Sequence, residues 1–271
     1  MTFKVLVFAF VSLLVTQAAH ARPTPSDDAL RCSQSALTLL GKLVRVGRFV
    51  YPGDAITSNG QNNVEVAAAT CKAWASDKSK AIAVLAYDAG IEYEKRLLVA
   101  LVDTSKLEIV SSYQGVIEED ASLTVGPDSF RIDTARYDLA PGVRAFGFDT
   151  ATSFNQGCVD GGFGPARTLF VQDGKTLRPI LEGFYISSWR FIKGGPSCAQ
   201  GNREIVTEDV SFAIGITKST TNGYANLRIT STSSYSNGER LKRKPLLYEP
   251  RYNGMNYPTD AFNRDIEKRR N

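Results

Sequence analysis

The run of short strand-like segments over residues 143–198 constrains the fold more than any other part of this chain. It begins with a strand-like run at 143–148, continues through a loop rich in Gly and Asp at 155–164, and ends with two further runs around a turn at Asp173-Gly174. The connections within it are too short for the crossovers that parallel strands need. The segment therefore predicts antiparallel strands.

A similar order of features occurs earlier in the chain. Strand-like runs at 83–88, 97–102 and 107–113 correspond to runs at 144–148, 168–171 and 177–185, and an Asp-x-x-x-Leu turn precedes the last run of both sets. Chance similarity between amphipathic hairpins is the alternative, but a three-stranded meander used twice is the simplest explanation. The predicted fold is mainly β, an antiparallel meander built as a sandwich or an incomplete propeller-like arrangement, with one short N-terminal helix.

A third hairpin is predicted around Asn222-Gly223, a dipeptide typical of two-residue type I′ turns. Such a turn pairs Ile216 with Ile229 and Ile214 with Ser231. The apolar residues Ile214, Ile216, Ala225, Leu227 and Ile229 then share one face, while Ser211, Thr217, Asn226 and Arg228 face water.

The N-terminal helix is expected to begin at a cap formed by Ser26 or Asp27 and to end at Gly41. Residues around 44–50 then predict a strand. The run at 64–74 fits either a helix face or an alternating strand, and the polar turn that follows it at 76–80 favours a strand in a hairpin with 81–87.

The first 21 residues have the three parts of a secretory signal peptide: Lys4, an apolar run at 5–15, and a small-residue cleavage site at Ala19-His20-Ala21. An apolar run of this length is too short to span a membrane. The only histidine, His20, is lost with this peptide. A mature chain without histidine has no Ser-His-Asp or Cys-His pair and lacks the commonest ligand of transition metals. A periplasmic or secreted protein without cofactor or bound metal is therefore expected.

Four cysteines follow the signal peptide, and an even number in an exported chain indicates disulfides. We predict the pairs Cys32–Cys71 and Cys158–Cys198, because the members of each pair lie within one local unit. The other two connectivities stay open. Without Cys-x-x-Cys spacing or histidine, a metal site is disfavoured.

We expect a single β-rich domain over residues 22–235 and a basic C-terminal segment over 236–271. Leu246-Leu247-Tyr248 can supply an edge strand between two prolines, and the charged residues from Arg264 onward are expected to fray. Removal of the signal peptide leaves 31 basic and 28 acidic residues, because Lys4 is its only charged residue. This balance is too even to indicate nucleic-acid binding.

Motifs of common enzyme classes are missing from the sequence, including the Gly-x-Ser-x-Gly elbow, Ser-x-x-Lys and the Walker loop. Paired carboxylates are the catalytic device left open, with Asp149, Asp160 and the run Glu118-Glu119-Asp120 as candidates. The glycines at 161–164 follow a cysteine loop, and they indicate a wide loop between strands rather than a phosphate-binding turn.

Tyr185, Trp189 and Phe191 are the candidate binding surface, because their spacing lets them share a face of one strand. Exposed aromatic side chains stack on sugar rings or anchor a protein partner, whereas buried ones only build the core. The loop that carries Cys158 is the second candidate.

The stretch at 133–147, from Asp133-Thr134-Ala135-Arg136-Tyr137 to Arg144-Ala145-Phe146-Gly147, resembles an uncharacterised family of secreted, β-rich proteins of Gram-negative bacteria. Cys71-Lys72-Ala73-Trp74 and Leu177-Arg178-Pro179-Ile180 fit the same resemblance. It implies a periplasmic or secreted setting and no activity.

The sequence thus favours a non-enzymatic binding protein of the bacterial cell envelope, whose partner is a protein or an envelope glycan. The alternative is a carboxylate-based hydrolase of cell-wall or extracellular glycan.

Overall fold

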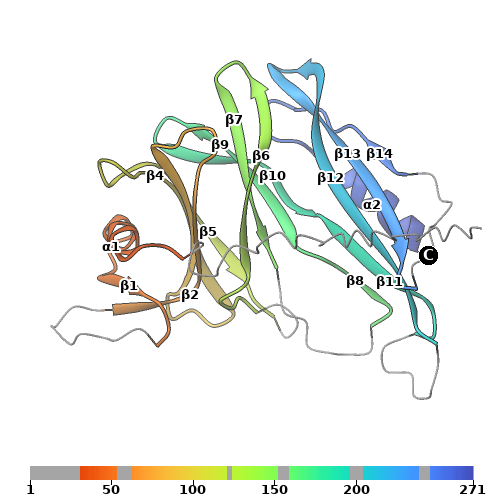
Figure 1. The fold of residues 1–271 in the computed structure, drawn as a ribbon, viewed down its shortest axis with the longest axis horizontal. Coiled ribbons are helices and arrows are strands. Elements are labelled where there is room, and N and C mark those ends of the chain that lie inside the picture. Colours follow the sequence, from red (N-terminus) through yellow and green to blue (C-terminus); the bar gives the residue numbers. More distant parts are fainter. Residues whose placement is uncertain are drawn as a thin grey trace, which may run out of the picture.

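The structure is a computed structural model and describes residues 31–53, 63–120, 124–151, 159–195, 204–237 and 245–270. It contains a curled sheet of nine strands and a second sheet of five strands (Figure 1). The predicted mainly β fold, built from antiparallel meanders, is confirmed.

The curled sheet consists of β1 (Arg48–Val50), β2 (Asn63–Ala73), β3 (Lys80–Asp88), β4 (Glu94–Asp103), β5 (Glu108–Glu118), β6 (Phe130–Ala140), β7 (Val143–Thr150), β9 (Ala166–Asp173) and β10 (Thr176–Tyr185). The second sheet consists of β8 (Gly161–Phe163), β11 (Ser187–Lys193), β12 (Val206–Thr221), β13 (Tyr224–Tyr235) and β14 (Leu247–Tyr248). The helices are α1 (Gln34–Leu43) and α2 (Asp260–Arg270).

Two meanders form the curled sheet, whose strand order is β1-β2-β3-β4-β5-β10-β9-β7-β6. The segments compared in the sequence become β3-β4-β5 and β7-β9-β10, and each gains one preceding strand, β2 or β6. The meanders meet where β5 pairs in parallel with β10. Strands β2 and β6, the first strands of the two meanders, approach each other, and the Lys72 ammonium donates a hydrogen bond to the carbonyl of Ile132 at 3.3 Å.

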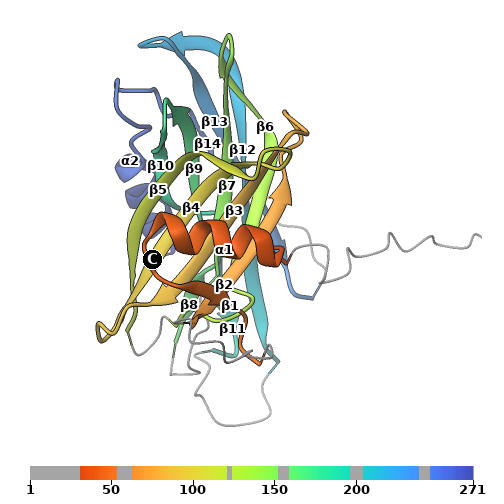
Figure 2. The same cartoon turned by 90° about the vertical axis from the view of Figure 1, so that its left-hand side faces the viewer.

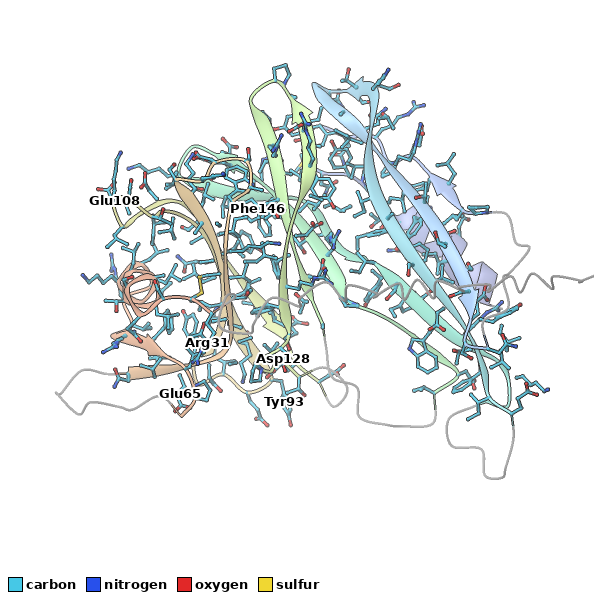
Figure 3. The ribbon with its side chains drawn as sticks, in the orientation of Figure 1. Arg31, Glu65, Tyr93, Glu108, Asp128 and Phe146 are labelled. Carbon is cyan, nitrogen blue, oxygen red and sulfur yellow. A yellow bond between two sulfur atoms is a disulfide. The ribbon has the colours of Figure 1, made fainter. Side chains whose placement is uncertain are left out.

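Strand alternation gives the curled sheet two apolar faces. On β3, Ile82 and Val84 point into the curl, and Ala83 and Leu85 point out of it. Aromatic rings fill the inside of the curl, where Phe170 stacks between Phe146 and Phe148 at centroid distances of 6.0 and 5.9 Å. Figure 3 labels Phe146 among these strands. The inside of the curl is therefore a packed core.

Helix α1 lies across the outside of β2, β3 and β4 (Figure 2). The predicted helix is present, but its cap is Ser33, whose hydroxyl accepts from the Ala36 N–H at 3.2 Å. It continues past Gly41, where a side chain would come within 2.9 Å of the Gly47 carbonyl. The glycine therefore allows a close approach inside the helix and does not end it. The strand expected around 44–50 is limited to Arg48–Val50.

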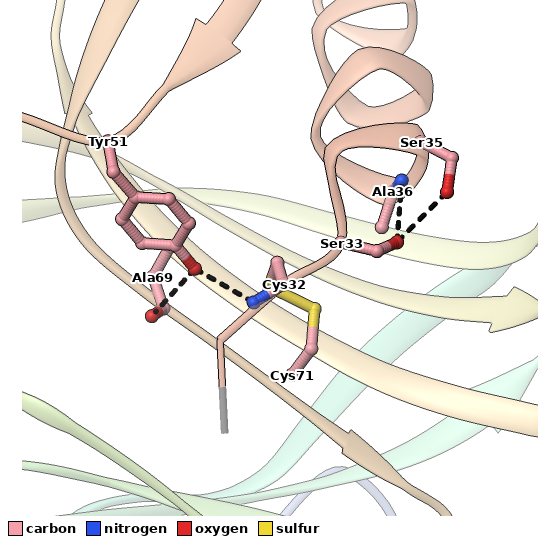
Figure 4. Close-up of a disulfide and its surroundings, with 7 residues drawn as sticks. All are labelled: Cys32, Ser33, Ser35, Ala36, Tyr51, Ala69 and Cys71. Carbon is pink, nitrogen blue, oxygen red and sulfur yellow. Dashed lines mark hydrogen bonds between the residues drawn. A yellow bond between two sulfur atoms is a disulfide. The ribbon is translucent and has the colours of Figure 1, made fainter. Parts of the chain in front are cut away.

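The predicted disulfide between Cys32 and Cys71 is confirmed and ties the chain before α1 to β2 (Figure 4). Beside it, the Tyr51 hydroxyl accepts from the Cys32 N–H at 2.8 Å. Cys158 and Cys198 lie outside the described residues, so their predicted pairing stays a prediction.

One long hairpin joins the two sheets. Its strands are β9 and β10 in the curled sheet and β8 and β11 in the second, and Ile186 lies at the transition, where its N–H donates to the Pro165 carbonyl at 2.9 Å. A core lies between the sheets, formed by Leu169, Ile180, Leu227 and Ile229 among others.

Helix α2 covers this core and contradicts the expectation that the C-terminal residues fray. Phe262 is 1% exposed, and its ring lies 4.9 Å from that of Phe184 and 5.2 Å from that of Phe212. Ile266, one turn later, is also buried. Two apolar side chains thus hold a helix whose composition alone predicts a solvated tail. Strand β14 is the edge strand expected around 246–248.

The β12–β13 hairpin has the predicted turn, with Asn222 and Gly223 both at positive φ (48° and 85°). Its register differs from the prediction, because Ile216 pairs with Leu227 and Ile214 with Ile229. Residues 217–219 lie opposite Asn226 alone, so the strand contains two extra residues. A shift of two keeps the apolar face intact. Asn226, expected in water, is 7% exposed.

A similar irregularity lies in the segment at 133–147. Residues 134–136 of β6 lie opposite Phe146 alone, between the pairs Asp133–Gly147 and Tyr137–Ala145. The Asp133 carboxylate accepts from the Ala135 N–H at 2.9 Å and holds this bulge. A bulge in an outer strand discourages edge-to-edge pairing with another chain. The segment therefore encodes local sheet geometry.

Asp138 in this segment gives a pH-dependent contribution to stability. Hydrogen bonds from Arg144 and Arg136 lower the pKa of its carboxyl to about 2. A depressed pKa stabilises the fold above the ordinary carboxyl pKa of about 3.9, and the contribution is lost as pH falls through the folded value. We expect Asp138→Asn to lower the free energy of unfolding at neutral pH. As the pH falls to about 2 and below, the variant and the parent chain should become equally stable. Denaturation curves from neutral to acidic pH measure the difference in unfolding free energy between variant and parent. A difference that does not change with pH would contradict the expectation. Asp128→Asn is the control.

Candidate functional site

The candidate aromatic residues Trp189 and Phe191 lie together on the exposed face of the second sheet. They occupy alternating positions of β11 and pair across strands with Asp209 and Thr207 of β12. Their rings meet edge to face with centroids 5.3 Å apart. Residues on the other face, such as Ser188, Glu208 and Phe212, are buried toward the core. We call the exposed side, defined by Trp189, Phe191, Thr207, Asp209, Ser211 and Ser234, the aromatic face.

Glycines allow both rings to lie against the backbone. A Cβ on Gly162, the β8 partner of Trp189, would lie 2.8 Å from the indole Nε1, so the indole lies over this glycine. A Cβ on Gly195 would lie 2.2 Å from Cγ of Phe191. The glycine cluster at 161–164 is thus an edge strand and not the expected wide loop. It provides a flat support that orients the indole.

Tyr185, the third candidate, lies apart from Trp189 and Phe191 and packs against another residue. It is at the end of β10 in the curled sheet, and its ring stacks on Phe163 at 4.6 Å. Phe163 pairs with Ser188, and paired residues share a face, so it lies on the side opposite Trp189. The structure therefore brings two of the three candidates together.

Polar groups adjoin the two rings on the aromatic face. Asp209 is exposed, and the Thr207 hydroxyl donates to its carboxylate at 3.0 Å. Asp209 pairs with Ser234 of β13, and Ser211 pairs with both Ser187 and Thr232. Aromatic rings within a row of hydroxyls and one carboxylate form the kind of surface that binds polyhydroxylated ligands.

Two aliphatic side chains at the same end of the second sheet are also exposed. Ile192 follows Phe191 and is 44% exposed, and Ile205 precedes β12 and is 59% exposed. Exposed apolar side chains beside aromatic ones are typical of protein interfaces. They are the observation that favours a protein partner.

The buried side of the second sheet contains a small cavity lined by both apolar and polar side chains. Its lining includes Ser188, Glu208, Ser231 and Ile266, and Nε of Arg190 lies 2.7 Å from the Glu208 carboxylate. About 40 Å³ is open to the centre of a water molecule, room for about three waters at roughly 10–15 Å³ each. The cavity fits solvent and is too small for a sugar.

The carboxylate candidate Asp149 is part of a buried ion cluster. Nε and Nη2 of Arg167 contact its two oxygens at 2.6 and 2.8 Å, and Nη1 contacts Asp133 at 2.6 Å. Burial opposes the charge on Arg167, but the hydrogen bond and charge of Asp149 outweigh it, so the pKa of Arg167 is raised. Burial and the hydrogen bond to Asp133 raise the pKa of Tyr137. Asp149 therefore has a structural role, because its ion pair with Arg167 joins β7 to β9.

The other acidic candidates lie apart. Glu119 accepts from the Val125 N–H at 2.7 Å and pairs with Lys95 at 3.1 Å. Glu118 and Asp120 beside it are exposed, and so is Asp160 next to β8. Among the described residues, no three His, Cys, Asp or Glu side chains are grouped so that they could hold a metal ion. In the same parts of the chain, no helix is both long and apolar enough to cross a membrane.

No protein-family model, curated protein or solved structure matches this chain. Sequence reasoning found Trp189 and Phe191, but it missed Asp209 and the support from Gly162. The alternating pattern Trp189-x-Phe191 was the available signal for the first pair. Asp209 and Gly162 become neighbours only through pairing of β8, β11 and β12.

Proposed function

We propose that this chain is a periplasmic or secreted, non-enzymatic binding protein that holds an envelope glycan on the aromatic face. The observation that carries the proposal is the Trp189 indole, which lies over Gly162 on an exposed sheet face lined by hydroxyls. A sugar ring presents apolar C–H groups on its faces and hydroxyls on its rim, and an aromatic ring among polar groups complements both.

Rigid support favours binding without movement of the site. The second sheet positions both rings, and the glycines remove the side chains that would tilt them. A binding surface that is already formed loses little conformational entropy when the ligand arrives. This is why the sheet face is a better candidate than the loops at its end.

The proposed compartment is supported by the Cys32–Cys71 disulfide, because such bonds persist in oxidising environments. The signal-peptide pattern and the resemblance to secreted proteins point the same way. We do not propose hydrolysis, since Asp149 and Glu119 both have ion-pair partners that give them structural roles.

A protein partner is the second candidate, carried by Ile192 and Ile205. It predicts that Ile205→Asp abolishes binding of the partner, whereas a glycan stacked on Trp189 should be indifferent to this change. Capture of a partner from envelope extract by the parent chain, but not by Ile205→Asp, would favour this candidate.

Removal of the indole tests the proposed function. We expect Trp189→Ala to weaken binding of a neutral β-1,4-linked N-acetylglucosamine tetramer by about ten- to hundredfold, because a central aromatic anchor contributes on the order of 1.5–3 kcal/mol. Isothermal titration calorimetry measures the effect. The buried Trp74 remains in the variant, and its fluorescence reports whether the fold is intact.

The matched control is Tyr93→Asn, which removes an exposed aromatic ring at the lower end of the curled sheet (Figure 3). Asparagine tolerates the positive φ of 59° at this position. Binding should be unchanged in the control. A parent chain that binds no tetramer, or a Trp189→Ala variant that binds it as well as the parent, contradicts the proposal.

A further inference from the structure

Resting on the proposed function, we infer that the aromatic face selects glycans with free amino groups, and that Asp209 binds the sugar ammonium next to the ring stacked at Trp189. The ligand class is a polysaccharide that contains unacetylated amino sugars.

The inference begins from one row of residues across the second sheet. Gly162, Trp189, Asp209 and Ser234 are successive partners on β8, β11, β12 and β13 and share the aromatic face. The indole extends over Gly162, and Asp209 lies on the other side of β11. A carboxylate therefore lies on the same face as the proposed stacking platform, on the other side of β11.

A hydrogen bond on the same strand orients this carboxylate. The Thr207 hydroxyl donates to it at 3.0 Å, and the Thr207 N–H donates to the Ser236 hydroxyl at 3.0 Å, which holds Thr207 in place. Charge-assisted hydrogen bonds to a positioned carboxylate are stronger than neutral ones. Asp209 is therefore the group on this face best placed to discriminate between sugar substituents.

The charge of the aromatic face and its margins favours a cation. Lys193 pairs with Glu204, and Arg228 pairs with Glu249 at 2.8 Å, so both of these basic residues are balanced by acids. Within the described parts of the chain, the side-chain partner of Asp209 is a hydroxyl and no cation. Among the residues that the structure describes on this face, Asp209 is thus an acid without a basic side-chain partner. It attracts an ammonium and repels phosphates, uronates and other acidic groups.

The spacing sets a minimum length for the ligand. The indole lies over β8 and the carboxylate rises from β12, two strands away, which corresponds to about 9–10 Å. One sugar ring cannot stack on the first and hydrogen-bond to the second at full contact. A chain of at least two linked sugars engages both.

The test compares two tetramers that differ only in acetylation, β-1,4-linked glucosamine and N-acetylglucosamine, by calorimetry at low salt and mildly acidic pH, where the amines are protonated. We expect the parent chain to bind the glucosamine tetramer about tenfold more tightly, as for one charge-assisted contact. The preference should shrink as salt is added.

Asp209→Asn keeps the size of the side chain and removes its charge. We expect it to abolish the preference, so that the glucosamine and N-acetylglucosamine tetramers bind the variant with equal affinity. Asp128→Asn, at an exposed turn of the curled sheet (Figure 3), is the matched control and should keep the preference.

The outcomes separate the two proposals. Equal binding of both tetramers by the parent chain, or a preference that survives in Asp209→Asn, overturns the selection of amino sugars but leaves the aromatic face as a glycan site. If neither tetramer binds, or if Trp189→Ala changes nothing, the proposed function fails and this inference fails with it.

Discussion

Arg167→Met should cost about 3–5 kcal/mol of the free energy of unfolding, the loss typical when one partner of a buried ion pair is removed. The Asp149 side chain is 3% exposed, and Arg167 contacts both of its oxygens. Methionine fills much of the space but provides no hydrogen-bond donor. The variant must bury a carboxylate whose charge is no longer balanced by the guanidinium. Urea denaturation followed by circular dichroism measures the loss.

A second variant separates loss of the pair from loss of volume. In Arg167→Met combined with Asp149→Leu, the buried pair is replaced by apolar side chains, and such replacements are often neutral or stabilising. Asp133 loses its ion pair with Arg167 in both variants and keeps the hydrogen bond from the Tyr137 hydroxyl, so its contribution is the same in both. We expect this double variant to recover most of the stability lost in Arg167→Met. If the single variant loses less than about 1 kcal/mol, or if the double variant is the less stable of the two, the cluster does not hold β7 and β9 as described.

The Arg167 cluster also shows where sequence reasoning reaches its limit. Asp133, Tyr137 and Asp149 each belonged to segments singled out in the sequence, but the cation that joins them lies 18 residues after Asp149. Strand periodicity places each residue on a face and gives no information on which strands become neighbours. The strand order β10-β9-β7-β6 brings the four side chains together.

Individual strands and tight turns were predictable because their signals are local. The Asn222-Gly223 turn requires positive φ at both positions, and its dipeptide predicts that directly. The register beyond the turn was wrong because Thr217 and Ser219 hydrogen-bond to each other, Thr217 Oγ1 accepting from the Ser219 N–H at 3.2 Å. This local contact forms a bulge, which the alternation of apolar residues does not reveal.

Helix α2 was missed for a different reason. Its sequence is rich in charged residues, and among residues 260–266, whose side chains the structure describes, Phe262 and Ile266 are buried in the core. Helical stability here comes from tertiary packing of two side chains against Phe184 and Phe212, residues that lie 50 or more positions earlier in the chain. The composition of a helix is dominated by its solvent-exposed residues, so it does not reveal the few buried residues that hold the helix in place.

The candidate site was half predictable on the same grounds. Trp189 and Phe191 alternate along one strand, so their shared face follows from the period of two. Tyr185 has the spacing that would place it on the same face of one continuous strand. However, the chain passes from the curled sheet to the second sheet at Ile186, so Tyr185 is separated from Trp189 and Phe191. The polar member Asp209 is contributed by the neighbouring strand.

Removal of the Cys32–Cys71 disulfide should destabilise the protein by up to about 4 kcal/mol. The cysteines are 39 residues apart, and closure of a loop of this length accounts for that figure in the chain-entropy model. The bond also fixes the start of α1 near β2, where Leu37 and Leu40 are buried against the outer face of the curled sheet. We expect Cys32→Ala with Cys71→Ala to loosen α1 first, so that the amides of 34–43 exchange with solvent faster than those of β3 and β4.

A reductant then distinguishes the two predicted disulfides. In the parent chain, reduction should cost at least the stability lost in the double variant, because it opens the Cys32–Cys71 loop together with any loop closed by Cys158 and Cys198. In the double variant, any further loss on reduction reports on Cys158 and Cys198, the second predicted pair. Equal stability of the parent chain and the double variant under oxidising conditions would show that packing of α1, and not the covalent link, holds this end of the chain. Denaturation curves of both proteins, with and without dithiothreitol, decide between these outcomes.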